Sequence, residues 1–182
     1  MREARAAYFR ENKLGEDGGY SSKWVRVQLG PVPFVFPNWP ARIRAVKLHD
    51  LHHILTGYRT TNVGEFEISA WEIASGCKDY WAAWFLNLSG MGAGLYRCPR
   101  ACLRAFVRGR RSDNLYGRDP EPLLDLTVAE ARTAMRVPDA SDRASRADIA
   151  RFALWTAAGC LFGLAWFVPP ALLVALVWWV VG

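Results

Sequence analysis

The sequence predicts a mainly α-helical protein: a single helical metal-binding domain followed by a C-terminal membrane helix or helical hairpin. Two observations support this prediction. The three histidines all lie in the segment HDLHH at 49–53, which Glu65 follows, and no charged residue occurs after Arg151. At 182 residues the chain has room for one domain and an appendage. The expected parts are a metal-binding domain over residues 1–137, a polar hinge over 138–151 and a membrane segment over 152–182.

The N-terminal third is expected to contain one short helix and little other regular structure. Residues 3–13 can form the helix, and the glycine-rich segment 15–24 is typical of turns. Residues 24–29 alternate between apolar and polar side chains, which predicts a short strand or an extended segment. Residues 30–40 hold four prolines and three aromatic residues, which favours an irregular loop that packs over the core or covers a pocket.

Two helices are predicted to carry the histidines and the acidic residues that follow them. The first covers 42–56, and Gly57 is a natural stop after it. The second covers about 64–75, where Glu65 and Glu72 are seven residues apart and therefore share one side of the helix. Both carboxylates can then face the histidine helix.

The following region is also predicted to be helical. Residues 80–96 are uncharged and have large apolar side chains at helical spacing, but three glycines favour a core helix or the wall of a lipid groove over a membrane span. The arginines between 97 and 118 form a stripe that carries the net charge of +6, and we expect it to contact anionic lipid or to be solvated. No nucleic-acid recognition motif is present, so nucleic acid is not an expected partner. A last short helix is expected over 127–137.

The apolar C-terminal segment over 152–182 is long enough to cross a membrane. As one straight helix it would reach about 45 Å, whereas a hydrocarbon core is about 30 Å thick. Pro169 and Pro170 therefore favour a break between a membrane helix over 152–168 and an arm over 171–181 that returns as a hairpin or lies at the interface. A kinked single crossing is one alternative, and a pair of buried core helices is another.

Charge and composition place the main domain at a membrane, on its cytoplasmic side. The arginines at 143, 146 and 151 directly precede the apolar segment, and positive charge favours the cytoplasmic face. No apolar stretch accompanies the arginines of residues 1–14, so we expect no signal peptide. The four cysteines are expected to be reduced, as is usual in a cytoplasmic protein.

The histidine segment is the predicted working centre. His49 and His53 are four residues apart and point from one helical face, and Asp50 lies on the same side. The predicted ligands of one divalent metal ion are His49, Asp50, His53 and Glu65. Mixed imidazole and carboxylate ligands suit zinc, which we expect first, and also iron or manganese. His52 is expected to support the ligands or to lie at the surface. A plainer interpretation is that His49 and His53 are two partly buried histidines that form hydrogen bonds with neighbouring groups and bind no metal.

The pattern HD, two residues, H, eleven residues and E resembles the motif of the protein-four family of coenzyme Q (ubiquinone) biosynthesis. The resemblance covers about residues 40–95 and includes Thr56-Gly57, Gly64 and Glu72. It implies that the four predicted ligands hold the metal of a helical protein acting on the ring of a polyprenylated quinone precursor. The implied activity is oxidative decarboxylation of that ring, or organisation of other quinone-biosynthesis proteins on a membrane. We assign Glu72 as the catalytic base or as a support for the ligands.

Two other classes of function remain open. In a zinc hydrolase, HDLHH would be a variant of the HExxH motif, with Glu72 as a third ligand. In a non-catalytic lipid-binding scaffold, the metal would only join two helices. A di-iron oxygenase is disfavoured because such proteins usually need two histidine-bearing motifs, whereas this sequence has one.

Overall fold

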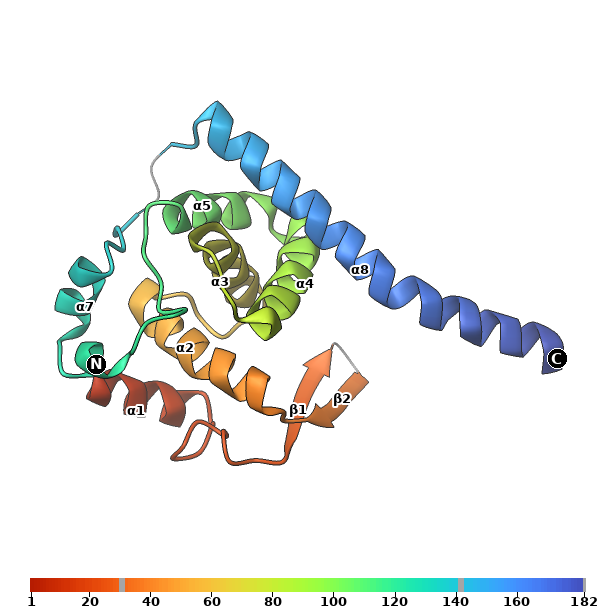
Figure 1. Cartoon of the computed structure of the whole chain (residues 1–182), viewed down its shortest axis with the longest axis horizontal. Helices are drawn as coiled ribbons and strands as arrows, with labels where there is room; N and C mark the ends of the chain where they lie inside the picture. Colours follow the sequence, from red (N-terminus) through yellow and green to blue (C-terminus); the bar gives the residue numbers. More distant parts are fainter. Residues whose placement is uncertain (30–31, 141–142, 182) are drawn as a thin grey trace.

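The computed structural model describes residues 1–29, 32–140 and 143–181. As predicted, the protein is mainly helical, and its two strands form a small antiparallel sheet (Figure 1). In chain order the elements are α1 (Arg2–Glu11), β1 (Trp24–Leu29), β2 (Val32–Pro37), α2 (Pro40–Thr56), α3 (Asn62–Ser75), α4 (Trp81–Arg97), α5 (Pro99–Gly109), α6 (Glu121–Leu124), α7 (Val128–Ala134) and α8 (Arg146–Val181).

Helix α3 lies at the centre of the domain, with α2, α4 and α5 around it (Figure 1). All residues from 68 to 73 are buried, so every side of this part of the helix is covered by other elements. Trp71 is fully buried and its indole N–H donates a hydrogen bond to the Ser112 hydroxyl at 3.2 Å. Since Glu72 lies within the same buried stretch, its carboxylate is inside the core and requires hydrogen-bond donors there.

Short local signals define the junction between α2 and α3, as the sequence predicts. Gly57 ends α2 with a φ of 75°, a left-handed conformation that glycine adopts without steric cost, and its N–H donates to the His53 carbonyl. Thr61 begins α3, because its hydroxyl accepts a hydrogen bond from the Gly64 N–H. The few residues between them bring the first turn of α3 back to the last turns of α2.

The expectation of an irregular loop over 30–40 is wrong for β2, which pairs with β1 in an antiparallel hairpin. Residues 30 and 31 lie outside the described residues. Pro33 and Pro37 are an even number of residues apart, so both occupy the same type of position in the ladder. Proline is tolerated at edge-strand positions whose N–H would face away from the partner strand. The spacing of these prolines, and not their number, therefore decides whether the segment can form a strand.

The arginine stripe does not form one uniform solvent-facing surface. Arg108 is buried on α5, where its Nε donates to the Pro138 carbonyl at 2.7 Å and its Nη1 donates to the Thr56 carbonyl at 2.8 Å. Its guanidinium also lies 5.3 Å from the centre of the Tyr58 ring. Arg108 thus satisfies a carbonyl at the C-terminal end of α2, where such groups lack helical partners. It also fixes the segment that follows the histidine helix.

Helix α8 begins at Arg146 and continues to Val181. The predicted break at Pro169 and Pro170 is therefore wrong, and so is the helical hairpin; the alternative of one continuous helix remains. The expected hinge over 138–151 is wrong from residue 146 onward, and residues 141 and 142 lie outside the described residues. The Ser145 hydroxyl accepts from the Asp148 N–H at 3.1 Å, and the Asp148 carboxylate accepts from the Ser145 N–H at 2.9 Å. This reciprocal capping begins the helix. Asp148 also pairs with Arg110 of α5.

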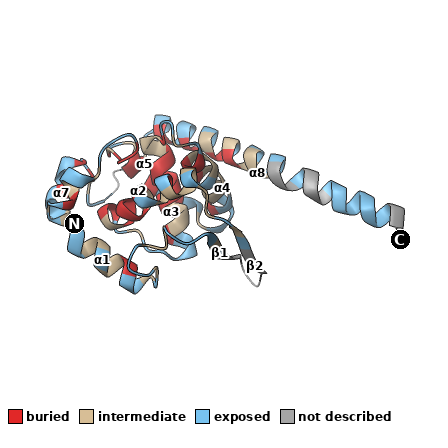
Figure 2. Ribbon diagram, turned by 60° about the horizontal axis from the view of Figure 1, so that its bottom comes forward, coloured by how far each residue is buried: buried red, intermediate tan, exposed pale blue. Residues whose placement is uncertain are grey.

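The first half of α8 packs on α4, and the remainder projects away from the domain (Figure 1). Gly159 and Gly92 allow the two backbones to approach closely, and Trp155 stacks on Trp84 with ring centres 5.3 Å apart. The side chains from 172 to 179 are exposed (Figure 2). Over Arg146–Ala165 the helix is long and apolar enough to span a membrane.

The contact between α4 and α8 predicts that Gly159→Val destabilises the protein by about 1–3 kcal/mol. A Cβ at position 159 would lie 2.6 Å from the Leu88 carbonyl oxygen, so the helices would have to separate. Thermal unfolding of the purified chain in mild detergent measures the change. Gly163→Val is the matched control, because no described atom lies within 4 Å of a Cβ built there. Equal losses in the two variants would contradict the proposed contact.

Candidate metal centre

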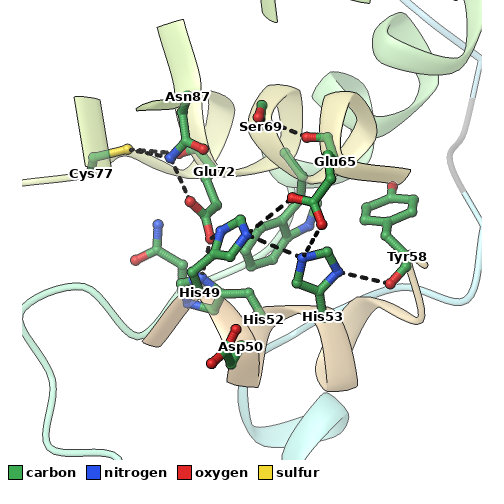
Figure 3. Close-up of polar contacts among 12 residues, drawn as sticks. His49, Asp50, His52, His53, Tyr58, Glu65, Ser69, Glu72, Cys77 and Asn87 are labelled. Carbon is green, nitrogen blue, oxygen red and sulfur yellow. Dashed lines mark hydrogen bonds and ion pairs between the residues drawn. The ribbon is translucent and has the colours of Figure 1, made fainter. Parts of the chain in front are cut away.

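Three of the predicted ligands converge on one point (Figure 3). His49 and His53 come from one face of α2, and Glu65 comes from the first turn of α3. The two Nε2 atoms are 3.1 Å apart, and the Glu65 carboxylate lies 3.5 Å from Nε2 of His49 and 3.4 Å from Nε2 of His53. One ligand atom from each residue lies within 4.8 Å of the others, a separation that a single metal ion can bridge.

The partners of the other ring nitrogens define which atoms face the centre. Nδ1 of His53 donates to the Tyr58 carbonyl at 2.9 Å, because a carbonyl oxygen can only accept. Nδ1 of His49 donates to the Glu72 carboxylate, also at 2.9 Å. A neutral imidazole with its proton on Nδ1 presents a bare lone pair at Nε2. In this neutral form both histidines direct a lone pair toward Glu65, which is the tautomer that a metal ion at this point would require.

The charges at this point favour a cation. Burial raises the pKa of Glu65, but the hydrogen bonds from His49 and His53 outweigh burial and lower that pKa to about 2. Burial lowers the pKa of His49, and the Glu72 and Glu65 carboxylates together raise it well above its usual value. Positive charge near the two Nε2 atoms therefore stabilises the site, and either a proton on His49 or a divalent ion in its place supplies that charge. The residues present therefore fit a divalent ion of the zinc, iron or manganese type.

Glu72 holds the histidine helix from inside the core. One of its carboxylate oxygens accepts from His49 at 2.9 Å and from His52 at 2.6 Å. The other accepts from Asn87 of α4 and from the Tyr116 hydroxyl at 2.7 Å. Burial raises the pKa of Glu72, but the two histidines lower it well below its usual value. Since each oxygen already accepts two hydrogen bonds, the geometry favours positioning of the ligands over the role of catalytic base.

His52 was predicted either to support the metal ligands or to lie at the surface, and the structure places it in the supporting position. It is fully buried, and its Nδ1 donates to Glu72 while its Nε2 accepts from the Leu115 N–H at 2.9 Å. Burial lowers its pKa, and a neutral ring is what this pair of partners requires. The sequence analysis missed Asn87 and Tyr116 as partners of Glu72. Asn87 was detectable as a polar residue in an uncharged helix, but no local signal pointed to Tyr116.

The structure does not bring Asp50 into the group formed by the other three predicted ligands. Its carboxylate accepts hydrogen bonds from the Tyr20 hydroxyl at 2.5 Å and the Tyr8 hydroxyl at 3.5 Å. Figure 3 shows it directed away from Glu65. Successive helical residues differ by about 100° in direction, so Asp50 faces the N-terminal segment while its neighbour His49 faces α3. Burial raises the pKa of Asp50.

The three converging ligands lie on the wall of a cavity of about 900 Å³ between α2, α3, α4 and the N-terminal segment. Tyr8 covers one side of the site, with its ring stacked on that of His53 at 5.7 Å between centres. The cavity is lined by both apolar and polar side chains; apolar examples are Val46, Phe66 and Leu86. A mixed lining of this kind suits an organic ligand with a polar head group.

No family model, curated protein or solved structure matches this chain. The resemblance described above rests on the motif formed by His49, Asp50, His53 and Glu65 and stays a prediction. What the site does is inferred from the arrangement of its side chains.

The geometry predicts that Glu65→Gln abolishes stoichiometric metal binding, whereas Asp50→Asn retains it. The first change removes the charge that faces both Nε2 atoms, and the second alters a carboxylate held by tyrosines. Elemental analysis of the purified variants after dialysis measures the bound metal. Loss of metal from Asp50→Asn would instead support the four-ligand site that the sequence predicts.

The network around Glu72 predicts that Glu72→Gln weakens metal binding about tenfold to a hundredfold. The amide presents an N–H₂ group where the carboxylate accepted hydrogen bonds, so at least one buried donor loses its acceptor and stability falls by about 1–3 kcal/mol. Metal titration and chemical unfolding measure the two effects. Glu67→Gln on the same helix is the control, and an equal effect there would argue against the positioning role.

Proposed function

We propose that this chain is a membrane-associated metal protein that acts on the aromatic head group of a polyprenylated quinone precursor. The observation that carries the proposal is the convergence of two imidazole nitrogens and one carboxylate on the wall of a large cavity. Its motif spacing supports the substrate class through the family resemblance. The exposed apolar part of α8 that projects from the same domain supports a substrate that remains in a bilayer.

The proposed reaction replaces a ring carboxyl group with oxygen. The bond between ring and carboxyl carbon breaks and carbon dioxide leaves, while one oxygen atom of dioxygen enters the ring. An external reductant supplies two electrons, and the second oxygen atom leaves as water. A divalent ion at the site would supply Lewis-acid stabilisation of negative charge on the substrate. His49, His53 and Glu65 would hold that ion.

In this proposal the side chains of the protein orient the metal ligands and cover the site. Glu72 fixes the ring of His49, and the Tyr58 carbonyl fixes the ring of His53. Tyr8 covers the site from the side of α1 and limits the access of water. Its hydroxyl and that of Tyr20 both bond Asp50, which attaches the N-terminal segment to α2.

The span that is long and apolar enough to cross a membrane is Arg146–Ala165, but much of it packs on α4. We therefore assign membrane attachment to the part of α8 that projects beyond α4. The residues after Phe162 number about twenty, and as a helix they reach about 30 Å, which matches a hydrocarbon core. The earlier part of the helix is in contact with α4, so it belongs to the domain. Arginines at 143, 146 and 151 precede the projecting part, and we propose a cytoplasmic domain on that basis.

The rival functions differ in what they require of Asp50 and of the metal. A zinc hydrolase with an HExxH-like site would use Asp50 as its base, but tyrosines hold that carboxylate. Ester or peptide cleavage that is lost on Asp50→Ala would favour the hydrolase. A scaffold that organises other quinone-biosynthesis proteins, or only binds lipid, would need the metal for folding alone.

Metal analysis and lipid extraction of the purified chain test the proposal directly. We expect one equivalent of a divalent metal and, by mass spectrometry, a prenylated aromatic acid. Cells that carry Glu65→Gln in place of the parent chain should accumulate the carboxylated precursor, whereas Glu67→Gln cells should not. Normal quinone levels with a folded, metal-free Glu65→Gln protein would exclude catalysis and favour the scaffold.

A further inference from the structure

The β1–β2 hairpin presents one face to its surroundings. Arg26 lies opposite Val35 in the ladder and Trp24 lies opposite Pro37, so these four side chains leave the same face, which we call the hairpin face. All four are exposed, and the exposed fraction is 57% for Trp24 and 50% for Val35. Large apolar side chains that are exposed together commonly mark a surface that a protein partner or a membrane covers.

Aromatic side chains connect the hairpin to α4, and α4 to α8. Phe36 of β2 packs against Trp39 with ring centres 5.6 Å apart, and Trp39 stacks on Trp81 at the start of α4 at 6.4 Å. Further along α4, Phe85 packs edge-on against Phe162 of α8 at 5.3 Å. The hairpin is therefore held beside α4, and α4 is held beside the point where α8 leaves the domain.

The hairpin lies at the end of the domain toward which α8 projects (Figures 1 and 2). Both views place it beside the start of the projecting part of α8, whereas α7 lies at the opposite end of the domain. A bilayer that receives the projecting part of α8 would therefore be close to the hairpin and far from α7.

The charges around the hairpin match an anionic lipid surface. No acidic residue occurs between Asp17 and Asp50, whereas Lys23 and Arg26 are exposed. The neighbouring helix α4 has no charged residue over 81–96. Tryptophan is enriched at the level of lipid head groups, and basic side chains attract anionic lipids. Exposed tryptophan and basic side chains without a nearby carboxylate therefore suit the head-group region of a membrane.

The hairpin face also borders the cavity of the candidate metal centre. Trp24 and Arg26 line this cavity, as does Leu86 of α4, and all three are exposed. Residues that line a cavity and are also exposed lie at its rim. Leu86 directly follows Phe85, the residue of α4 that contacts α8. The rim of the cavity and the origin of the projecting part of α8 thus lie on adjacent residues of one helix.

We propose that the hairpin face lies on the head groups of an anionic bilayer when α8 is anchored there, and that the cavity opens at this lipid surface. The partner is lipid, and an amphiphilic ligand can then enter the cavity from the bilayer without crossing bulk water. This inference rests on the part of the proposed function that anchors α8 in a membrane. It depends neither on the metal nor on the class of substrate.

A fluorescent probe in the full-length chain tests the inference. An environment-sensitive fluorescent amino acid replaces Val35 on the hairpin face or, as the matched control, the exposed Ala134 of α7. The chain is reconstituted into vesicles of phosphatidylcholine and phosphatidylglycerol that contain a lipid with a nitroxide quencher near its head group. Relative to detergent, we expect emission from position 35 to shift to shorter wavelength and to be quenched. Emission from position 134 should do neither.

Two variants test whether the hairpin face makes the contact. Arg26→Gln should lower the ratio of lipid-bound to free hairpin about fivefold, as expected for one basic residue at an anionic surface. Trp24→Ser should also reduce the quenching at position 35, and so should vesicles of phosphatidylcholine alone. The matched control is Arg136→Gln, which makes the same change of charge at an exposed residue that follows α7. Melting temperatures in mild detergent establish that each variant is folded.

Each outcome separates this inference from the proposed function. Equal quenching at positions 35 and 134, or quenching that Arg26→Gln and Trp24→Ser leave unchanged, would overturn the inference and leave the anchoring of α8 intact. A chain that does not float with the vesicles would overturn both the inference and the membrane attachment. If position 35 is quenched but the purified chain holds neither metal nor a prenylated acid, the lipid contact stands and the proposed reaction does not.

Discussion

The ionised carboxylate of Glu72 lies inside the helical core, and the positions of several neighbouring elements follow from the hydrogen-bond donors that it requires. A buried charge costs several kcal/mol unless donors surround it. Here the donors come from His49 and His52 of α2, Asn87 of α4 and Tyr116 of the segment after α5. Segments far apart in the sequence are thereby held around one residue of α3. The same bonds orient His49, so stability and ligand geometry depend on one group.

The candidate site has a rigid part, which holds the three converging side chains, and a second part that covers them. Its ligands come from α2 and α3, whose junction is fixed by Gly57, Thr61 and the buried Arg108. Its cover comes from the N-terminal segment, which is attached to α2 through the phenol contacts with Asp50. A rigid first part keeps the ligand atoms aligned, and a cover joined by a few polar contacts can permit entry of a substrate.

Local patterns predicted most of the helices and the three side chains that converge at the candidate site. The spacing of His49 and His53, the stop at Gly57 and the acidic residue that opens α3 are all short-range signals, and they specified the convergence seen in the structure. The role of Asp50 could not be predicted, because its tyrosine partners lie more than 25 residues earlier in the chain. The start of α8 was missed because the Ser145 and Asp148 pair was not recognised as a cap. The family resemblance and the class of substrate remain predictions.

The continuity of α8 links the domain to any bilayer that receives its end. The helix packs closely on α4 near Gly159 and has no described break before Val181, so we expect the domain and the projecting part of α8 to move together. Bilayers of different thickness change the tilt of a spanning helix. A change of tilt would therefore rotate the whole domain and alter the height of the cavity entrance above the lipid surface.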